Sequence, residues 1–147
     1  MIAGMVPPVS RQAGDLHLAL RAATRDLHDA VEALFAPLDL ARRDHYARFL
    51  AAHAAAILPL EAALEQAGID RLLPDWPARA RAAALRADLR ALDAAVPAMP
   101  TLVLAPGAQV LGTAYVLEGS RLGGAVILRR LGTGLPDAFL RHGQGQA

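Results

Sequence analysis

The sequence contains no cysteine and no lysine, and it has few aromatic residues. Without cysteine, disulfides, thiolate metal ligands and cysteine nucleophiles are all excluded. The 15 arginines and 14 acidic residues leave a net charge of +1, so there is no strong field to attract nucleic acid or an anionic membrane. Aromatic residues make up only 4% of the chain, whereas alanine and leucine together make up about 40%. The composition therefore predicts an all-α fold.

Several sequence motifs are also missing. The chain has no HExxH pair, which argues against a hydrolytic zinc site, and neither GxSxG nor GxxxxGK[ST], which mark common hydrolases and nucleotide-binding loops. It lacks the unbroken apolar run of roughly twenty residues that a bilayer requires, and its start does not resemble a signal peptide. We therefore expect a cytoplasmic protein with a flexible leader over 1–14, a single domain over 15–141 and a disordered tail over 142–147.

Apolar residues at helical spacing predict five helices. Asp15 is the expected N-cap of the first, Gly68 ends the second after a kink at Pro59, and Asp75 precedes the third. The predicted spans are 15–37, 40–68, 78–95, about 106–131 and 135–142. The third should be the most solvated, because its outer side carries Arg79, Arg81, Arg86, Asp88 and Arg90.

The segment YVLEGSRLGG, residues 115–124, places three glycines within the predicted fourth helix. Each glycine inside a helix costs about 1 kcal/mol relative to alanine, so a compensating benefit is expected. Gly119 and Gly123 are four residues apart with Gly124 beside them, which would leave a smooth patch on one helix face. Such a patch suits a flat ligand or the close approach of another helix, and the spacing alone leaves both open.

His28 has a distinctive neighbourhood in ATRDLHDAVEALF, because Thr24 and Glu32 lie one helical turn away on either side. A carboxylate at that spacing can accept the Nδ1 proton of the imidazole and leave Nε2 for a metal. Arg21 and Arg25 lie nearby and could meet carboxylates of a ligand. Ordinary charge pairs on an exposed helix would give the same spacing. The histidines without such company are His17, His45, His53 and His142.

A metal-competent histidine on one helix and a glycine patch on another describe a flat, metal-containing ligand, and haem fits that description. ATRDLHDAVEALF resembles the proximal helix of haem oxygenases, and LGTAYVLEGSRLGGAVILRRL resembles their distal helix. The similarity is greatest to the bacterial branch associated with bacteriophytochromes. The resemblance covers roughly residues 15 to 141, and YVLEGSxLGG is its specific part.

The resemblance implies an all-α, haem oxygenase-like helical bundle that holds haem between the first helix and a kinked, glycine-rich distal helix. His28 would be the proximal iron ligand, with Glu32 as its partner. Further cofactor contacts would come from Thr24, Arg21, Arg25 and Tyr115. The residues on the catalytic, distal side would be Gly119, Ser120, Gly123 and Gly124, with Ser120 at the place where mammalian-type members carry Asp. The chain is also shorter at its C-terminus than members of the family are.

The activity implied by the resemblance is oxidation of haem, as both substrate and cofactor, to biliverdin, CO and iron. O₂ and an external electron donor, ferredoxin or a flavin reductase, would be required, and a bacteriophytochrome is a candidate acceptor of the bilin. Two alternatives stay open. One is a haem- or bilin-binding protein without turnover, suggested by Ser120 and the short C-terminus. The other is a helical protein-interaction module that uses the glycine patch.

Overall fold

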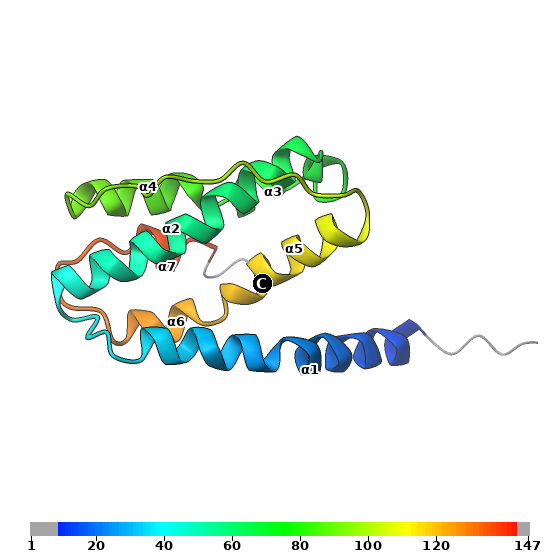
Figure 1. The fold of residues 1–147 in the computed structure, drawn as a ribbon, viewed down its shortest axis with the longest axis horizontal. Helices are drawn as coiled ribbons and strands as arrows, with labels where there is room; N and C mark the ends of the chain where they lie inside the picture. Colours follow the sequence, from blue (N-terminus) through cyan, green and yellow to red (C-terminus); the bar gives the residue numbers. More distant parts are fainter. Residues whose placement is uncertain (1–8, 144–147) are drawn as a thin grey trace, which may run out of the picture. The chain divides into compact units, whose positions relative to one another are not determined.

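The computed structural model describes the backbone of residues 9–143 and the side chains from Gly14 onward. Residues 1–8 of the predicted leader and 144–147 of the predicted tail lie outside the described residues. The chain forms two compact units, which divide after Pro37. The first contains α1 (Val9–Phe35), coloured blue in Figure 1. The predicted N-cap at Asp15 is wrong, because the helix begins six residues earlier, at Val9.

Within its own unit, the apolar stripe of α1 is exposed. Leu27 and Leu34 are 71% and 76% exposed, and Leu16 is 61% exposed. In the described part of this unit α1 is the sole element, so the unit itself offers no surface on which the stripe could be buried. Sequence periodicity therefore identified the helix but not the environment of its apolar face.

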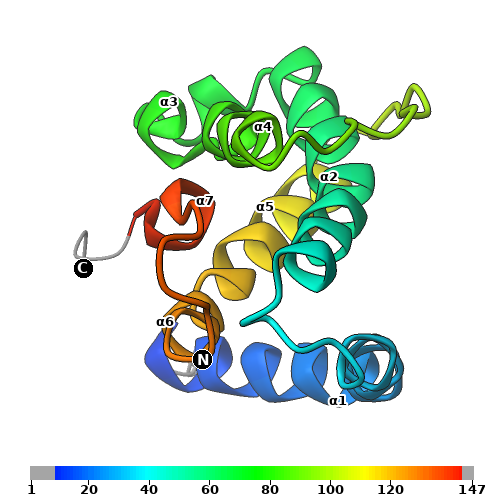
Figure 2. The ribbon, with the colours of Figure 1, turned by 90° about the vertical axis from the view of Figure 1, so that its left-hand side faces the viewer.

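The second unit is an assembly of helices around α2 (Arg43–Gln66), the longest of them (Figures 1 and 2). Its interior is formed by large side chains that are completely or almost completely buried: Tyr46, Leu50, Leu64, Ile69, Leu85 and Leu89. The other elements are η1 (Ile69–Arg71), α3 (Trp76–Arg79), α4 (Ala82–Ala91), α5 (Ala108–Ser120), α6 (Gly124–Leu128) and α7 (Ala138–Arg141). The described residues contain no strand, in agreement with the predicted all-α fold.

The end of α2 follows the sequence prediction. The helix runs through Pro59 and ends at Gln66, and Gly68 takes a left-handed conformation with φ 77° just beyond it. By length and composition α2 could span a membrane, but half of its most apolar window is buried inside the unit. Core helices pass the same length and composition test, so this is weak evidence for a membrane span.

The predicted third helix is two helices. Ala80 adopts an extended conformation, with φ −61° and ψ 131°, between α3 and α4. The buried Glu61 on α2 accepts hydrogen bonds from the backbone N–H groups of Arg81 and Ala82, at 2.9 to 3.0 Å. These are N–H groups of the first turn of α4, which a continuous helix would have satisfied internally. Asp75 makes no capping hydrogen bond and instead pairs with Arg79 at 2.6 Å.

This break overturns part of the predicted solvated face. Arg81 is 4% exposed and Asp88 is 2% exposed. Asp88 accepts hydrogen bonds from the backbone N–H groups of Ala138 and Phe139, which begin α7. Arg81 turns toward α5. A side chain on the outside of one continuous helix would not reach these partners, so the prediction failed where the helix is interrupted.

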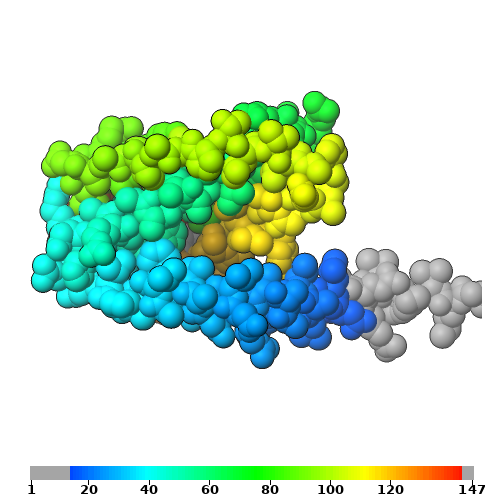
Figure 3. Space-filling view, in the orientation of Figure 1, coloured from blue at the N-terminus to red at the C-terminus, as the bar shows by residue number. Residues whose placement is uncertain are grey.

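The predicted fourth helix is also interrupted, at the glycines themselves. α5 ends at Ser120, the chain turns over 121–123, and α6 starts at Gly124. An extended connection over residues 94–105 leads from the end of α4 to α5 along the surface of the unit (Figure 3, yellow-green). The predicted short fifth helix is confirmed as α7, whose Phe139 and Leu140 are buried.

Candidate functional site

On α1, His28 lies beside two carboxylates. Its Nδ1 is 3.6 Å from Oε1 of Glu32 and 4.0 Å from Oδ1 of Asp29, and all three side chains are exposed. Nδ1 is the ring nitrogen that faces the acidic groups, so Nε2 is the nitrogen left for a metal. The predicted pairing of His28 with Glu32 is therefore present, and Asp29 is a second neighbour that the sequence pattern did not single out.

Thr24, predicted on the same ridge, uses its hydroxyl elsewhere. Its Oγ1 donates a hydrogen bond of 2.9 Å to the carbonyl of Leu20, one turn back in the same helix. Arg21 and Arg25 are exposed on α1, as a role toward a charged ligand requires. Of the residues predicted on this helix, the structure thus brings together His28 and Glu32 but does not join Thr24 to them.

In the second unit the glycines form a turn rather than a patch along one helix. Gly119 lies in the last turn of α5, Gly123 precedes α6, and Gly124 is buried as the first residue of α6. Within the part of this unit that the structure describes, a Cβ at Gly119 would meet no atom within 4 Å, and one at Gly123 would meet only the carbonyl oxygen of Ser120, at 3.7 Å. Close packing inside the unit therefore does not explain these two glycines.

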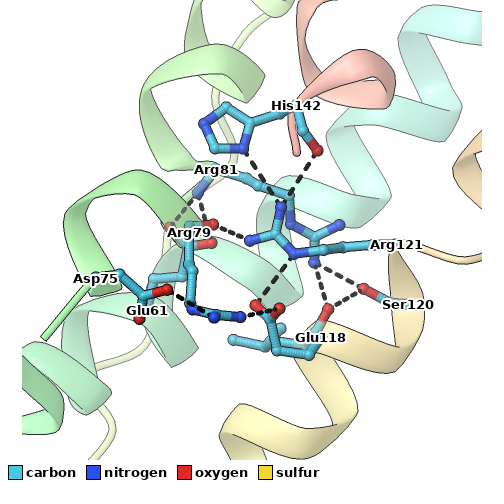
Figure 4. Close-up of polar contacts among 9 residues, drawn as sticks. Glu61, Asp75, Arg79, Arg81, Glu118, Ser120, Arg121 and His142 are labelled. Carbon is cyan, nitrogen blue, oxygen red and sulfur yellow. Dashed lines mark hydrogen bonds and ion pairs between the residues drawn. The ribbon is translucent and has the colours of Figure 1, made fainter. Parts of the chain in front are cut away.

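The turn is held in place by two residues of its own motif, Glu118 and Arg121 (Figure 4). Glu118 accepts a hydrogen bond from Nε of Arg121 at 3.0 Å and another from Arg79 at 2.8 Å. Arg121 also donates to the backbone carbonyls of Arg79 and His142. The carboxylates of Asp75 and Glu118 raise the pKa of Arg79. These contacts tie the turn to the end of α3 and to the residue after α7.

The predicted catalytic Ser120 is engaged with the buried Arg81. One guanidinium nitrogen of Arg81 donates to Oγ of Ser120 at 2.7 Å and to the carbonyl of Leu117 at 3.0 Å. The Ser120 hydroxyl in turn donates to the same carbonyl at 2.7 Å. Because a hydroxyl has one proton, Ser120 can accept a further hydrogen bond in this arrangement but has no proton left to donate.

His53, predicted as a boundary residue, is half-buried near this turn. Its ring contacts the rings of Phe49 and Phe139, whose centroids are 4.1 and 5.8 Å away. Nδ1 is 2.9 Å from the carbonyl of Phe49, the geometry of an Nδ1–H donor. Burial is the main cause that lowers the pKa of His53, and the positive charge of Arg81 lowers it further. The hydrogen bond to the Phe49 carbonyl acts in the opposite direction. His53 is therefore an uncharged ring in the folded protein at neutral pH.

Comparison with known proteins identifies the family. The family model described as heme oxygenase matches residues 14–138, a span that contains both His28 and the glycine turn. The chain belongs to the heme oxygenase family. It is 35% identical over 111 residues to heme oxygenase PigA of Pseudomonas aeruginosa, covering 73% of this chain and 56% of that protein. It is 38% identical over 88 residues to a heme oxygenase of Xanthomonas campestris pv. campestris, and this match covers 60% of this chain and 53% of that protein.

No solved structure matches this heme oxygenase family member at comparable significance. The chain spans about half the length of the curated relatives it matches. The family match confirms two predictions made from the sequence, the resemblance to haem oxygenases and the all-α, haem oxygenase-like fold.

Sequence reasoning missed Arg81, which the structure places against Ser120. The signal that could have found it is weak: Arg79 and Arg81 alternate with alanine after Pro77, a spacing that a continuous helix would distribute around its circumference. Glu118 and Arg121 were within the quoted motif, and their i,i+3 spacing already allows an ion pair on one helix. Their contacts with Arg79 and His142 depend on the helix breaks and could not be assigned from the sequence.

Proposed function

We propose that this chain binds haem and oxidises it to biliverdin, CO and iron, using O₂ and electrons from ferredoxin or a flavin reductase. The observation that carries the proposal is the match to the heme oxygenase family over residues 14–138, which includes the histidine and the glycine turn. The names of the two curated relatives, each a heme oxygenase, support it. Cytoplasmic location and transfer of the bilin to a bacteriophytochrome are part of the same proposal.

The residues on α1 fit an iron ligand. Nδ1 of His28 faces Glu32 at 3.6 Å. An imidazole held with Nδ1 toward a carboxylate presents the lone pair of Nε2, which is the atom that binds iron in proteins with a histidine axial ligand. His28 is 69% exposed, so its ring is accessible to a ligand of the size of haem. Arg21 and Arg25 would pair with the propionates, and Thr24 would contribute the contact surface of its methyl group, because its hydroxyl is used by Leu20.

The glycine turn fits the other role, contact with the face of a flat ring. Gly119, Gly123 and Gly124 carry no side chain, and Tyr115, 45% exposed one turn before Gly119, would supply an aromatic edge. Bound haem would supply both the iron that activates O₂ and the carbon skeleton that is cleaved. The hydroxyl of Ser120 accepts a hydrogen bond from Arg81 and donates its proton to Leu117. Toward a nearby water it would therefore act as an acceptor and not as a donor.

The first experiment is a hemin titration of the purified protein, followed by optical spectroscopy. We expect a Soret band that His28→Ala shifts or abolishes, whereas the control His17→Ala, a change of the same kind on the same helix, leaves it intact. Absence of a band in the wild type would refute haem binding. A spectrum that is identical in His28→Ala would remove His28 as the iron ligand.

The second experiment tests turnover. Reductant and O₂ are added to the hemin complex, and bilin is followed by absorbance and identified by chromatography. Ferredoxin with its reductase is compared with a flavin reductase, because both are proposed donors. Formation of biliverdin and CO supports the enzyme. A stable Soret band without bilin under both donors would instead support the alternative, a haem-binding protein without turnover.

A further inference from the structure

A small cavity lies in the second unit, next to the glycine turn, and Ser120, Arg121 and Gly124 are among the residues that line it. Its volume is about 30 Å³, enough for one or two groups of the size of water. Cationic or basic side chains line much of its wall: His53, Arg81, Arg121 and His142. The rest of the described lining consists of Ser120, Gly124 and apolar residues, with no carboxylate among them. The composition of the wall favours a negatively charged occupant.

The guanidinium of Arg81 is the central group of this wall. Arg81 is 4% exposed, and its Nε is buried without a hydrogen-bond partner among the described residues. The ring of Phe139 lies 5.2 Å from its guanidinium carbon, which provides one partial compensation for the charge. Burial, aided by Arg121 and opposed by Glu61 and Glu118, lowers the pKa of Arg81 to about 10, so the side chain is still a cation at neutral pH.

The nearby carboxylates are used by other donors. Glu61 accepts from the backbone N–H groups of Arg81 and Ala82, and Glu118 accepts from Arg79 and Arg121. In the part of the chain that the structure describes, no carboxylate oxygen lies within 4.0 Å of the Arg81 guanidinium, and the groups that it reaches are the neutral oxygens of Leu117 and Ser120. Glu61 and Glu118 therefore act on Arg81 only from beyond ion-pair distance, and a buried cation without a carboxylate in contact favours an anion beside it.

We propose that this cavity binds one small monovalent anion, of the size of a halide ion, against the guanidinium of Arg81. A cavity with room for one or two water-sized groups admits an ion of the size of chloride or bromide. The remaining N–H groups of Arg81 are the donors, and Arg121 adds positive potential. The bound anion would hold the guanidinium in place, and Arg81 would in turn hold Ser120 at the start of the glycine turn. This inference concerns the second unit by itself and does not depend on haem.

The test uses apoprotein and compares sodium chloride and sodium bromide with sodium gluconate at equal ionic strength. Unfolding by urea is followed through Trp76, the single tryptophan, which is buried in this unit. Specific binding to the folded state predicts a midpoint that rises with chloride and then follows the logarithmic dependence of ligand binding. Arg81→Met should lose the chloride-dependent rise, and the control Arg90→Met, an exposed arginine on the same helix, should keep it.

Equal midpoints in chloride and gluconate for the wild type would overturn the proposal, because they would mean that the cavity holds water only. A rise that persists in Arg81→Met would also overturn it, because the effect would then arise elsewhere. If Arg81→Met does not fold, bromide-soaked crystals of the wild type decide the matter: an anomalous peak within hydrogen-bond distance of Arg81 supports the site, and its absence refutes it.

Discussion

Glu61 provides the sharpest test of how the interrupted helices are held. Its carboxylate, on α2, is 2% exposed and accepts from the N–H groups of Arg81 and Ala82 at the start of α4. Arg81, in the N-cap position, makes no capping bond with its own side chain. Glu61 therefore caps α4 from a neighbouring helix, and it fixes the backbone from which the Arg81 side chain extends toward Ser120.

The magnitude follows from the two donors that Glu61→Ala would leave without a partner. An orphaned buried N–H costs about 1–3 kcal/mol, so two cost about 3 kcal/mol when one of them is partly accessible to water. Burial raises the pKa of Glu61, because the charged carboxylate is less stable there than in water. Glu61→Ala removes this unfavourable charge as well, and that gain offsets the loss of the side chain's packing contacts. Glu61→Gln keeps one acceptor oxygen but turns an amide N–H₂ toward a donor, so we expect about half the effect, roughly 1.5 kcal/mol.

The assay is urea unfolding monitored by Trp76 fluorescence, which reports on the second unit. The matched control is Glu65→Gln, one turn later on α2, where the side chain is exposed and accepts a long hydrogen bond of 3.4 Å from Trp76 Nε1, which the glutamine oxygen can still accept. We expect it to change stability by less than about 0.5 kcal/mol. If Glu61→Ala lies within about 1 kcal/mol of the wild type, water satisfies the two N–H groups and the capping argument fails.

Three further predictions concern the same unit. Gly119→Ala should raise apoprotein stability by about 0.5–1 kcal/mol in urea unfolding, because its Cβ meets open space within the unit, whereas Gly132→Ala should lower it, because its Cβ would collide with the carbonyl of Ala41. A loss of stability in both would contradict the first. Burial lowers the pKa of His53, so the unfolded state binds the proton more readily and stability should fall as the pH drops below about 6.5; His53→Gln should flatten this dependence, and an unchanged slope would argue against it. Glu118→Gln should increase amide hydrogen exchange at residues 122 and 124 about tenfold, measured by NMR, through loss of its two arginine contacts; unchanged exchange would mean that the turn does not depend on the ion pairs.

The helix content and the pairing of His28 with Glu32 could be predicted from sequence because both depend on local spacing. An i,i+4 pair follows from helix geometry alone, whatever the rest of the chain does. The positions of the helix breaks could not be predicted, because they depend on distant partners. Ala80 is extended where Glu61, some twenty residues earlier, captures the N–H groups that follow it. Alanine at that position gives no local signal of a break.

The misplaced arginine has two causes. The predicted helix grouped Arg81 with Arg86 and Arg90 as one solvated face, although about 100° per residue puts Arg81 about 140° from Arg86 and about 180° from Arg90. The second cause is the helix break. The extended Ala80 changes the direction of the chain immediately before Arg81, and the side chain then reaches α5. Burial of this one arginine is therefore a consequence of tertiary capping, and it is also what provides Ser120 with a charged neighbour.

That neighbour changes what Ser120 can do. The sequence alone invites comparison of Ser120 with the aspartate of mammalian-type relatives, as a weaker group that orders water. In the structure the proton of Ser120 is donated to the carbonyl of Leu117, and its oxygen accepts from Arg81. The positive charge at this end of α5 thus belongs to Arg81, and the serine is the polar contact that positions it. An aspartate in the same place would pair with Arg81, whereas serine leaves the cation without a carboxylate in contact, beside a small cavity. The departure from the aspartate pattern and the proposed anion site therefore have one physical origin.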